Sequence, residues 1–248
     1  MLIAFLHMYF CTIQMYIEAV NLSVTYFCIS NTIFHKYSFL SPSGEGRNII
    51  SSDNGLAYTG RLELLPLGQF KNGGDYFEGD LVREATPKIS SGFTYNFNSN
   101  AIRVDGQLGN FLYDLRDIST IMADFLFKYN GFACSDEYLN RFANDPVTTN
   151  ENNDVRYVFK RYGQNFQSSY IFLSDFEIIG RYSEVRPDVD IIIYEPLVRQ
   201  YTFGVTKYLK GHRVKLQSDV TFERNDFFSD TQADNENWQL RFQIELGI

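Results

Sequence analysis

The chain has 248 residues, of which 17% are aromatic, and a formal net charge of -8 at pH 7. This charge argues against a nucleic-acid-binding protein, because such proteins normally present a basic face. A mean hydropathy of -0.23 is far too low for a membrane protein built from helices. A transmembrane β-barrel accounts for both values, because one face of each strand meets lipid, the other meets water, and aromatic residues collect at the interfaces.

The first 40 residues show the weakest pattern of the chain. Only Glu18 and Lys36 are charged there, and a secretory signal peptide needs a positively charged start. Three interpretations stay open: degraded or poorly patterned strands, a mistranslated upstream region, and a membrane helix over 1–20, which is just long enough to span. We treat 1–40 as a segment of uncertain structure and predict that the barrel occupies 41–248.

From Lys36 onward, apolar and polar residues alternate in a series of segments, beginning with 32–41 and 56–65. Alternation with a period of two predicts strands that have one apolar and one polar face. The links between later strands are short at 130–131, 173–175 and 209–212, and long at 98–116, 143–155, 184–199 and 225–236. Short turns on one rim and long loops on the other are typical of outer-membrane barrels.

The last segment, 237–248, alternates without a break and defines the two faces most clearly. We predict that the apolar sides of the strands face lipid, and this side includes Phe125, Tyr170, Phe203, Leu216 and Phe242. Asp136 falls on the apolar face of its predicted strand, 132–142. Either a bulge at Ser135 and Asp136 shifts the register, or the carboxylate lies near an interface, where its cost is small.

Several segments between 43 and 248 together resemble one protein family. These segments read GEGRN, LAYTGRLELLPLGQF, GGDYFEGDL with REATPK, GQLGNFL, TIMADFLFKYNGF, EIIGRYS, VTKYLKGH, VKLQSDVTF and WQLRFQIEL. In this order they resemble the phosphate-selective porin O and P family of Bacteroidetes outer membranes. The resemblance implies an antiparallel transmembrane β-barrel of ~16 strands in the outer membrane. It also implies a possible homotrimer, outer-membrane lipid and the barrel assembly machinery as partners, and passive passage of anions or small polar solutes.

The chain departs from this family in two respects. From Thr32 onward the pattern contains about ten strands, and with 1–40 it allows about 10 to 12 of the ~16 that such a porin has. The sequence therefore predicts the C-terminal part of a porin whose N-terminal part is missing. The chain also ends in Ile248, where family members typically end in an aromatic residue that the assembly machinery recognises.

The predicted polar faces carry basic residues that are candidates for lining a pore. These are Arg61, Lys88, Lys128, Arg141, Arg161, Arg181, Lys215 and Arg241. The acidic residues expected on the same faces are Glu63, Asp124, Glu137, Glu177, Asp219, Glu223 and Glu245. The two sets nearly balance, so cross-strand ion pairs account for them better than a row of anion-binding sites. No phosphate-binding residue of the family can be placed on a matching motif here.

The sequence gives no sign of an enzyme, a metal site or a cofactor. The three histidines lie far apart, and none belongs to a catalytic or metal-binding motif. We therefore expect an outer-membrane porin that passes small polar or anionic solutes by passive diffusion. The alternatives are a non-conducting outer-membrane barrel with a structural or surface-binding role, and a soluble lipid-binding barrel.

The sequence also predicts whether this chain closes its barrel. A closed barrel needs hydrogen bonds between its first and last strands, because an unpaired edge in lipid leaves costly backbone groups. No segment before Lys36 has a pattern comparable with 237–248. We predict an open sheet of about ten strands in series, with 1–40 irregular or loosely paired.

Overall fold

The structure, a computed structural model, describes residues 10–18, 21–30, 33–41, 55–106, 109–228 and 233–246. It is all-β and contains one antiparallel twelve-stranded sheet in which strands follow one another in chain order. The sheet consists of β1 (Phe10–Glu18), β2 (Asn21–Ser30), β3 (Ile33–Ser41), β4 (Ala57–Leu65), β5 (Lys88–Arg103), β6 (Phe111–Tyr129), β7 (Phe132–Ala143), β10 (Arg161–Ile171), β11 (Phe176–Pro187), β12 (Leu197–Lys210), β13 (Val214–Asp226) and β14 (Asn235–Leu246). The predicted all-β, antiparallel architecture is confirmed.

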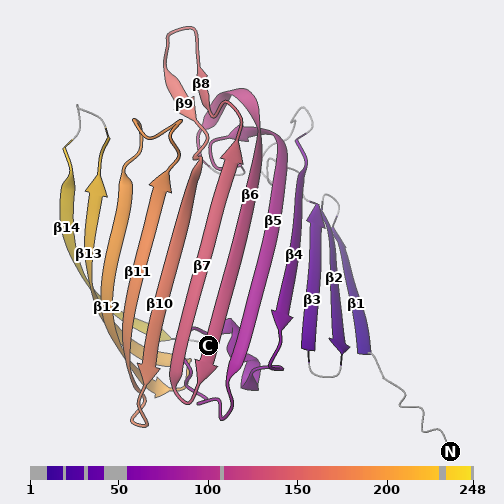
Figure 1. The fold of residues 1–248 in the computed structure, drawn as a ribbon, viewed down its shortest axis with the longest axis vertical. Coiled ribbons are helices and arrows are strands. Elements are labelled where there is room, and N and C mark those ends of the chain that lie inside the picture. The colour runs from indigo at the N-terminus through magenta and orange to yellow at the C-terminus, as the bar shows by residue number, and fades with distance from the viewer. Residues whose placement is uncertain are drawn as a thin grey trace, which may run out of the picture.

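Two smaller elements complete the described chain. β8 (Val147–Thr149) and β9 (Val155–Tyr157) form a hairpin that projects above the upper rim of the sheet (Figure 1). A short 3-10 helix, η1 (Lys71–Tyr76), lies in the link between β4 and β5, near the lower rim. Within the described ranges, no helix is long and apolar enough to span a membrane.

The ten strands predicted from residue 32 onward are present as β3 to β7 and β10 to β14. The prediction that 1–40 is irregular or loosely paired is wrong for the part of that segment that the structure describes, and of the three interpretations the one that agrees with it is poorly patterned strands. β1 pairs with β2, β2 with β3 and β3 with β4, each without a shift in register. Backbone hydrogen bonds between neighbours hold such strands, and these bonds do not require side chains to alternate.

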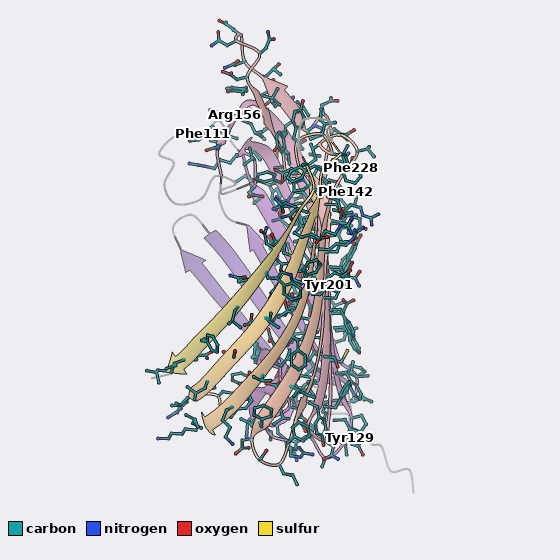
Figure 2. All side chains as sticks on the ribbon, turned by 90° about the vertical axis from the view of Figure 1, so that its left-hand side faces the viewer. Phe111, Tyr129, Phe142, Arg156, Tyr201 and Phe228 are labelled. Carbon is teal, nitrogen blue, oxygen red and sulfur yellow. The ribbon has the colours of Figure 1, made fainter. Side chains whose placement is uncertain are left out.

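The sheet is open in the residues described. Its order begins with β1 and ends with β14, and these two strands do not pair with each other. Both edges of the sheet bend toward the same side (Figure 2). The predicted open sheet is therefore confirmed for the described residues, with β1 and β2 in addition to the expected ten strands.

Two predicted long loops contain strand residues that the sequence does not suggest. β5 continues to Arg103 and β6 starts at Phe111, so that the predicted loop 98–116 shrinks to 104–110. The predicted loop 143–155 contains β8. A small apolar core holds the strands together above the alternating segments, and it consists of Ala101, Val104, Leu112, Ile118, Ala143 and Val158. The alternation ends where this core begins, because its residues are buried against one another.

Asp136 does not mark a bulge. β7 pairs with β6 and with β10 without a shift in register, and Asp136 lies between Phe125 and Phe166. Its Oδ1 accepts a hydrogen bond of 3.3 Å from Gln164 Nε2. The bulge proposed from the sequence is therefore wrong, and the carboxylate stands on the apolar face with a polar neighbour.

Candidate functional site

All eight predicted basic residues lie on the same face of the sheet. Residues that pair across antiparallel strands point to the same side, and residues two apart in one strand do so as well. The registers from β4 to β14 connect the set in this way. We call this side the polar face, and its basic residues are Arg61, Lys88, Lys128, Arg141, Arg161, Arg181, Lys215 and Arg241.

An ion pair that crosses a whole strand occupies the polar face over β5. Arg61 on β4 donates from Nη1 and Nη2 to the carboxylate of Asp124 on β6, at 2.6 and 3.0 Å. Gly92 of β5 lies between them, and a Cβ there would stand 2.4 Å from Arg61 Nη2 and from Asp124 Oδ2. The absence of a side chain at Gly92 therefore allows the guanidinium and the carboxylate to meet.

Other members of the set have partners close by. Arg141 meets Asp105 at 2.6 Å, Lys215 meets Glu245 at 3.0 Å and Arg241 meets Asp219 at 3.3 Å. Arg181 Nε donates to Gln167 Oε1 at 2.8 Å, and the Arg161 guanidinium lies 4.8 Å from the centre of the Phe159 ring. Each of these cations is engaged within the chain, so the face is a charge-balanced polar wall.

The link between β4 and β5, residues 66–87, folds over the polar face at the rim of the short turns. We call it the inner loop. Its residue Glu78 accepts a hydrogen bond from Gln167 Nε2 on β10 at 2.9 Å. Its Gly79 packs against Glu177 of β11 and Tyr208 of β12. One loop reaches several strands at once because the sheet curves around it. The sequence predicts only short turns on this rim, and the inner loop is an exception to that pattern.

Lys128 is the centre of the contact between the inner loop and the sheet. Its side chain is only 2% exposed, and its Nζ donates to Gly74 O at 2.7 Å and to Gly79 O at 2.8 Å. Asp80 and Glu84, both buried, belong to the same loop. Lys128 was predicted to line a pore, but the inner loop covers it, and its role in the structure is to hold that loop.

Asp80 ties the inner loop to the turn between β6 and β7. Its carboxylate accepts hydrogen bonds from Glu84 N, at 3.1 and 3.0 Å, and from Gly131 N at 2.8 Å. The Glu84 carboxylate in turn accepts a hydrogen bond of 2.6 Å from Lys71 N. These bonds satisfy three backbone donors that the fold would otherwise leave without partners.

Arg83 of the inner loop also binds the turn between β6 and β7, and it reaches the end of β10. Its Nη1 donates to Ile171 O at 2.6 Å, and its Nη2 donates to Asn130 O at 2.8 Å. The predicted Asn-Gly hairpin is confirmed, because Asn130 and Gly131 both have positive φ, 48° and 88°. A Cβ on Gly131 would lie 2.5 Å from Arg83 Nη1, so the turn needs glycine for its contact as well as for its backbone.

A cavity of about 230 Å³ lies beneath the inner loop, bounded by Lys128 and by Gly211 and His212 in the turn between β12 and β13. The His212 ring stacks on Phe77 of the loop, with ring centres 4.2 Å apart and planes 10° from parallel. Burial lowers the pKa of His212, and the positive charges of Lys128 and Lys215 lower it further, while Glu245 opposes them. His212 is therefore a neutral aromatic partner at neutral pH.

We predict that acid weakens this contact. Because the pKa of His212 is lower in the folded chain than in the unfolded chain, the unfolded chain binds a proton first. The stabilisation that neutral His212 contributes is fully present above the ordinary histidine pKa of about 6.5 and is lost as the pH falls below that value. Limited proteolysis of the inner loop across this range measures the effect, and the variant His212→Gln should remove the acid-sensitive part. An unchanged pH profile in that variant would contradict the assignment.

The opposite side of the sheet, which we call the outer face, carries apolar and aromatic side chains. It includes the five residues predicted to face lipid, namely Phe125, Tyr170, Phe203, Leu216 and Phe242. Four of these are exposed, Phe203 by 57% and Phe242 by 75%. Tyr170 is half-buried, because Arg83 stands 5.8 Å from the centre of its ring. The described chain thus exposes large apolar groups along most of one face.

A row of aromatic rings crosses the outer face from β7 to β14. Neighbouring ring centres are 6.3 Å apart for Tyr138 and Tyr162, 5.2 Å for Tyr182 and Tyr201, 6.4 Å for Tyr201 and Phe222, and 5.0 Å for Phe222 and Trp238. Tyr129 lies near the lower end of the same face (Figure 2). Aromatic residues therefore extend from the rim of short turns toward the rim of long loops.

Among the residues that the structure describes, no three His, Cys, Asp or Glu side chains gather as a metal site would require. Comparison of the chain with protein-family models, with curated proteins and with solved structures finds no match. The two unlike faces of the sheet and the inner loop are therefore the features from which a function can be argued.

Proposed function

We propose that this chain is an outer-membrane porin, or part of one, that passes small polar or anionic solutes by passive diffusion. The observation that carries this proposal is the division of the sheet into a charge-balanced polar face and an exposed apolar outer face. The sequence resemblance to the phosphate-selective porin O and P family points to the same function.

Water is a poor solvent for the outer face. Soluble proteins rarely expose large contiguous apolar patches, and the exposed residues here include Phe93, Tyr95, Phe203, Leu240 and Phe242. Strands that alternate in this way suit lipid on one side and water on the other. A soluble lipid-binding barrel would need apolar side chains on the side where the inner loop packs, and that side carries ion pairs instead.

The inner loop would narrow the aqueous path at the rim of short turns. It lays Glu78 beside Gln167 and 3.8 Å from Arg181 on the polar face. Polar side chains of both signs therefore surround the narrowed region, and a small hydrated solute would meet hydrogen-bond donors and acceptors there.

Conductance of the purified protein in planar bilayers tests the proposal. We expect discrete current steps after insertion. An outer-membrane barrel with a structural or surface-binding role would insert and give no steps, which would favour that alternative. A protein that stays soluble and monodisperse without detergent would contradict both membrane functions.

The charge balance of the polar face predicts weak ion selectivity. The cations pair with acids at 2.6 to 3.3 Å in Arg61–Asp124, Arg141–Asp105, Lys215–Glu245 and Arg241–Asp219, so few free charges remain to attract one sign of ion. Reversal potentials in a salt gradient should lie close to zero. Strong anion selectivity, with currents that saturate in phosphate, would overturn this prediction and restore the specificity that the family name implies.

A further inference from the structure

Several charged side chains gather on the outer face next to the long loops of β11, β12 and β13. Glu184, Arg199 and Arg224 stand directly opposite one another across these strands. Arg186 and Asp226 follow two residues further along β11 and β13 and point to the same side. We call these five residues the outer-face cluster.

Hydrogen bonds fully engage the acids of the outer-face cluster. Glu184 accepts from Tyr162 Oη at 3.0 Å, from Tyr182 Oη at 2.8 Å and from Arg199 Nε at 3.1 Å. Asp226 accepts from Arg199 Nη1 at 2.7 Å and from Arg224 Nε at 2.6 Å. The two carboxylates are thus occupied within the protein.

The arginines at the two ends of the cluster remain open to the outside. The side chains of Arg186 and Arg224 are 46% and 48% exposed, against 12% for Glu184 and 16% for Asp226. Three guanidinium groups face two carboxylates, so the cluster carries one excess positive charge. Glu236, opposite Arg224 on β14, is an exposed acid nearby.

The cluster sits at the end of the aromatic row. Glu184, Arg199 and Arg224 each lie two residues beyond a ring of that row, on the side of the long loops. Arg186 stands 5.5 Å from the centre of the Tyr162 ring. Aromatic rings with polar tips followed by arginines are the order of groups that suits the boundary between lipid chains and headgroups.

We propose that the outer-face cluster binds the anionic phosphomonoester headgroup of a membrane lipid. Phosphate oxygens match the donors that Arg186 and Arg224 leave exposed, and a guanidinium is well suited to bind phosphate through two parallel hydrogen bonds. The acyl chains of such a lipid would lie along Tyr201, Phe203 and Val220. The inference rests on the proposed function, because it requires the outer face to lie in lipid. The lipid site would be separate from any solute on the polar face, because that face is the opposite side of the sheet.

The single tryptophan of the chain offers a direct test. Trp238 belongs to the aromatic row, 5.0 Å from Phe222 on the neighbouring strand. The full chain is reconstituted in bilayers of phosphatidylcholine that contain a fraction of phosphatidic acid, with bromine on the acyl chains of one lipid at a time. Bromine quenches Trp238 only when its lipid lies beside it. We expect phosphatidic acid to be preferred about fivefold over phosphatidylcholine, the preference that one excess positive charge near the membrane surface can supply.

Matched variants decide whether the cluster causes the preference. R186Q/R224Q should lose it, R186K/R224K should keep most of it, and K210Q/R213Q, which removes the same charge at the opposite rim, should leave it unchanged. Equal quenching by both brominated lipids in the original chain would overturn the inference and leave the porin proposal intact. No quenching by either lipid would overturn the membrane location itself. Loss of the preference in excess inorganic phosphate would show a site for the free ion instead, and would also overturn it.

Discussion

Replacement of Lys128 by methionine is expected to lower the free energy of unfolding by about 3 to 5 kcal/mol, the range found when one partner of a buried ion pair is removed. The ammonium group is buried between Gly74 O and Gly79 O, and the negative charges of the buried Asp80 and Glu84 act on it. Without it, the two carbonyl groups lose their donor, and the buried acids lose a positive charge that stabilises them.

The same variant should release the inner loop from the polar face. Unfolding in detergent micelles measures the stability, while protease cleavage within 66–87 and larger current steps in bilayers report the loop. Lys88→Met is the matched control, because Lys88 Nζ donates to Leu67 O in an exposed bond and its loss should cost about 1 kcal/mol or less. Equal losses in the two variants would contradict the role assigned to Lys128.

The second large effect is expected on the outer face. Phe203→Arg should cost about 2 to 4 kcal/mol in a bilayer if Phe203 lies near the membrane midplane. Phe203 is 57% exposed and stands opposite Val220, so the new charge would enter the apolar surface. Gln217→Arg on the polar face of β13 is the control, and it should be tolerated because the side chain meets water. Reversible unfolding in lipid measures the free energy of unfolding of both variants. Equal losses would show that the outer face does not face lipid or that the polar face does not face water.

Alternation predicted the strands and their faces well where each strand has two different environments. The sides assigned to Phe125, Phe203 and Phe242 follow directly from a period of two, and the backbone registers place them together on the outer face. The same logic placed Asp136 on the apolar face correctly but left open whether a bulge is present. A polar residue on an apolar face has the same appearance in a sequence whether or not a bulge is present, and only the pairing with β6 and β10 decides it.

The inner loop could not be predicted in the same way. Its polar, glycine-rich sequence has no period, and its conformation depends on groups distant in the chain, such as Lys128 and Gly131. Lys128 shows how far alternation can predict a site. Alternation placed Lys128 on the polar face correctly, but its burial depends on the inner loop, which the sequence indicates only as a connection between strands. The strands before residue 40 stayed one of three open interpretations for a related reason, since backbone pairing leaves no periodic trace in a sequence.

The contacts of the inner loop also set an order of assembly. The strands of the sheet pair with their neighbours in the chain, which are mostly local contacts and can form one hairpin after another. The loop is different, because Arg83 bonds to Ile171 and Glu78 bonds to Gln167, both on β10. It can therefore dock only after β6, β7 and β10 have joined β5. A folding chain would therefore build this part of the sheet first and seat the inner loop on it afterwards.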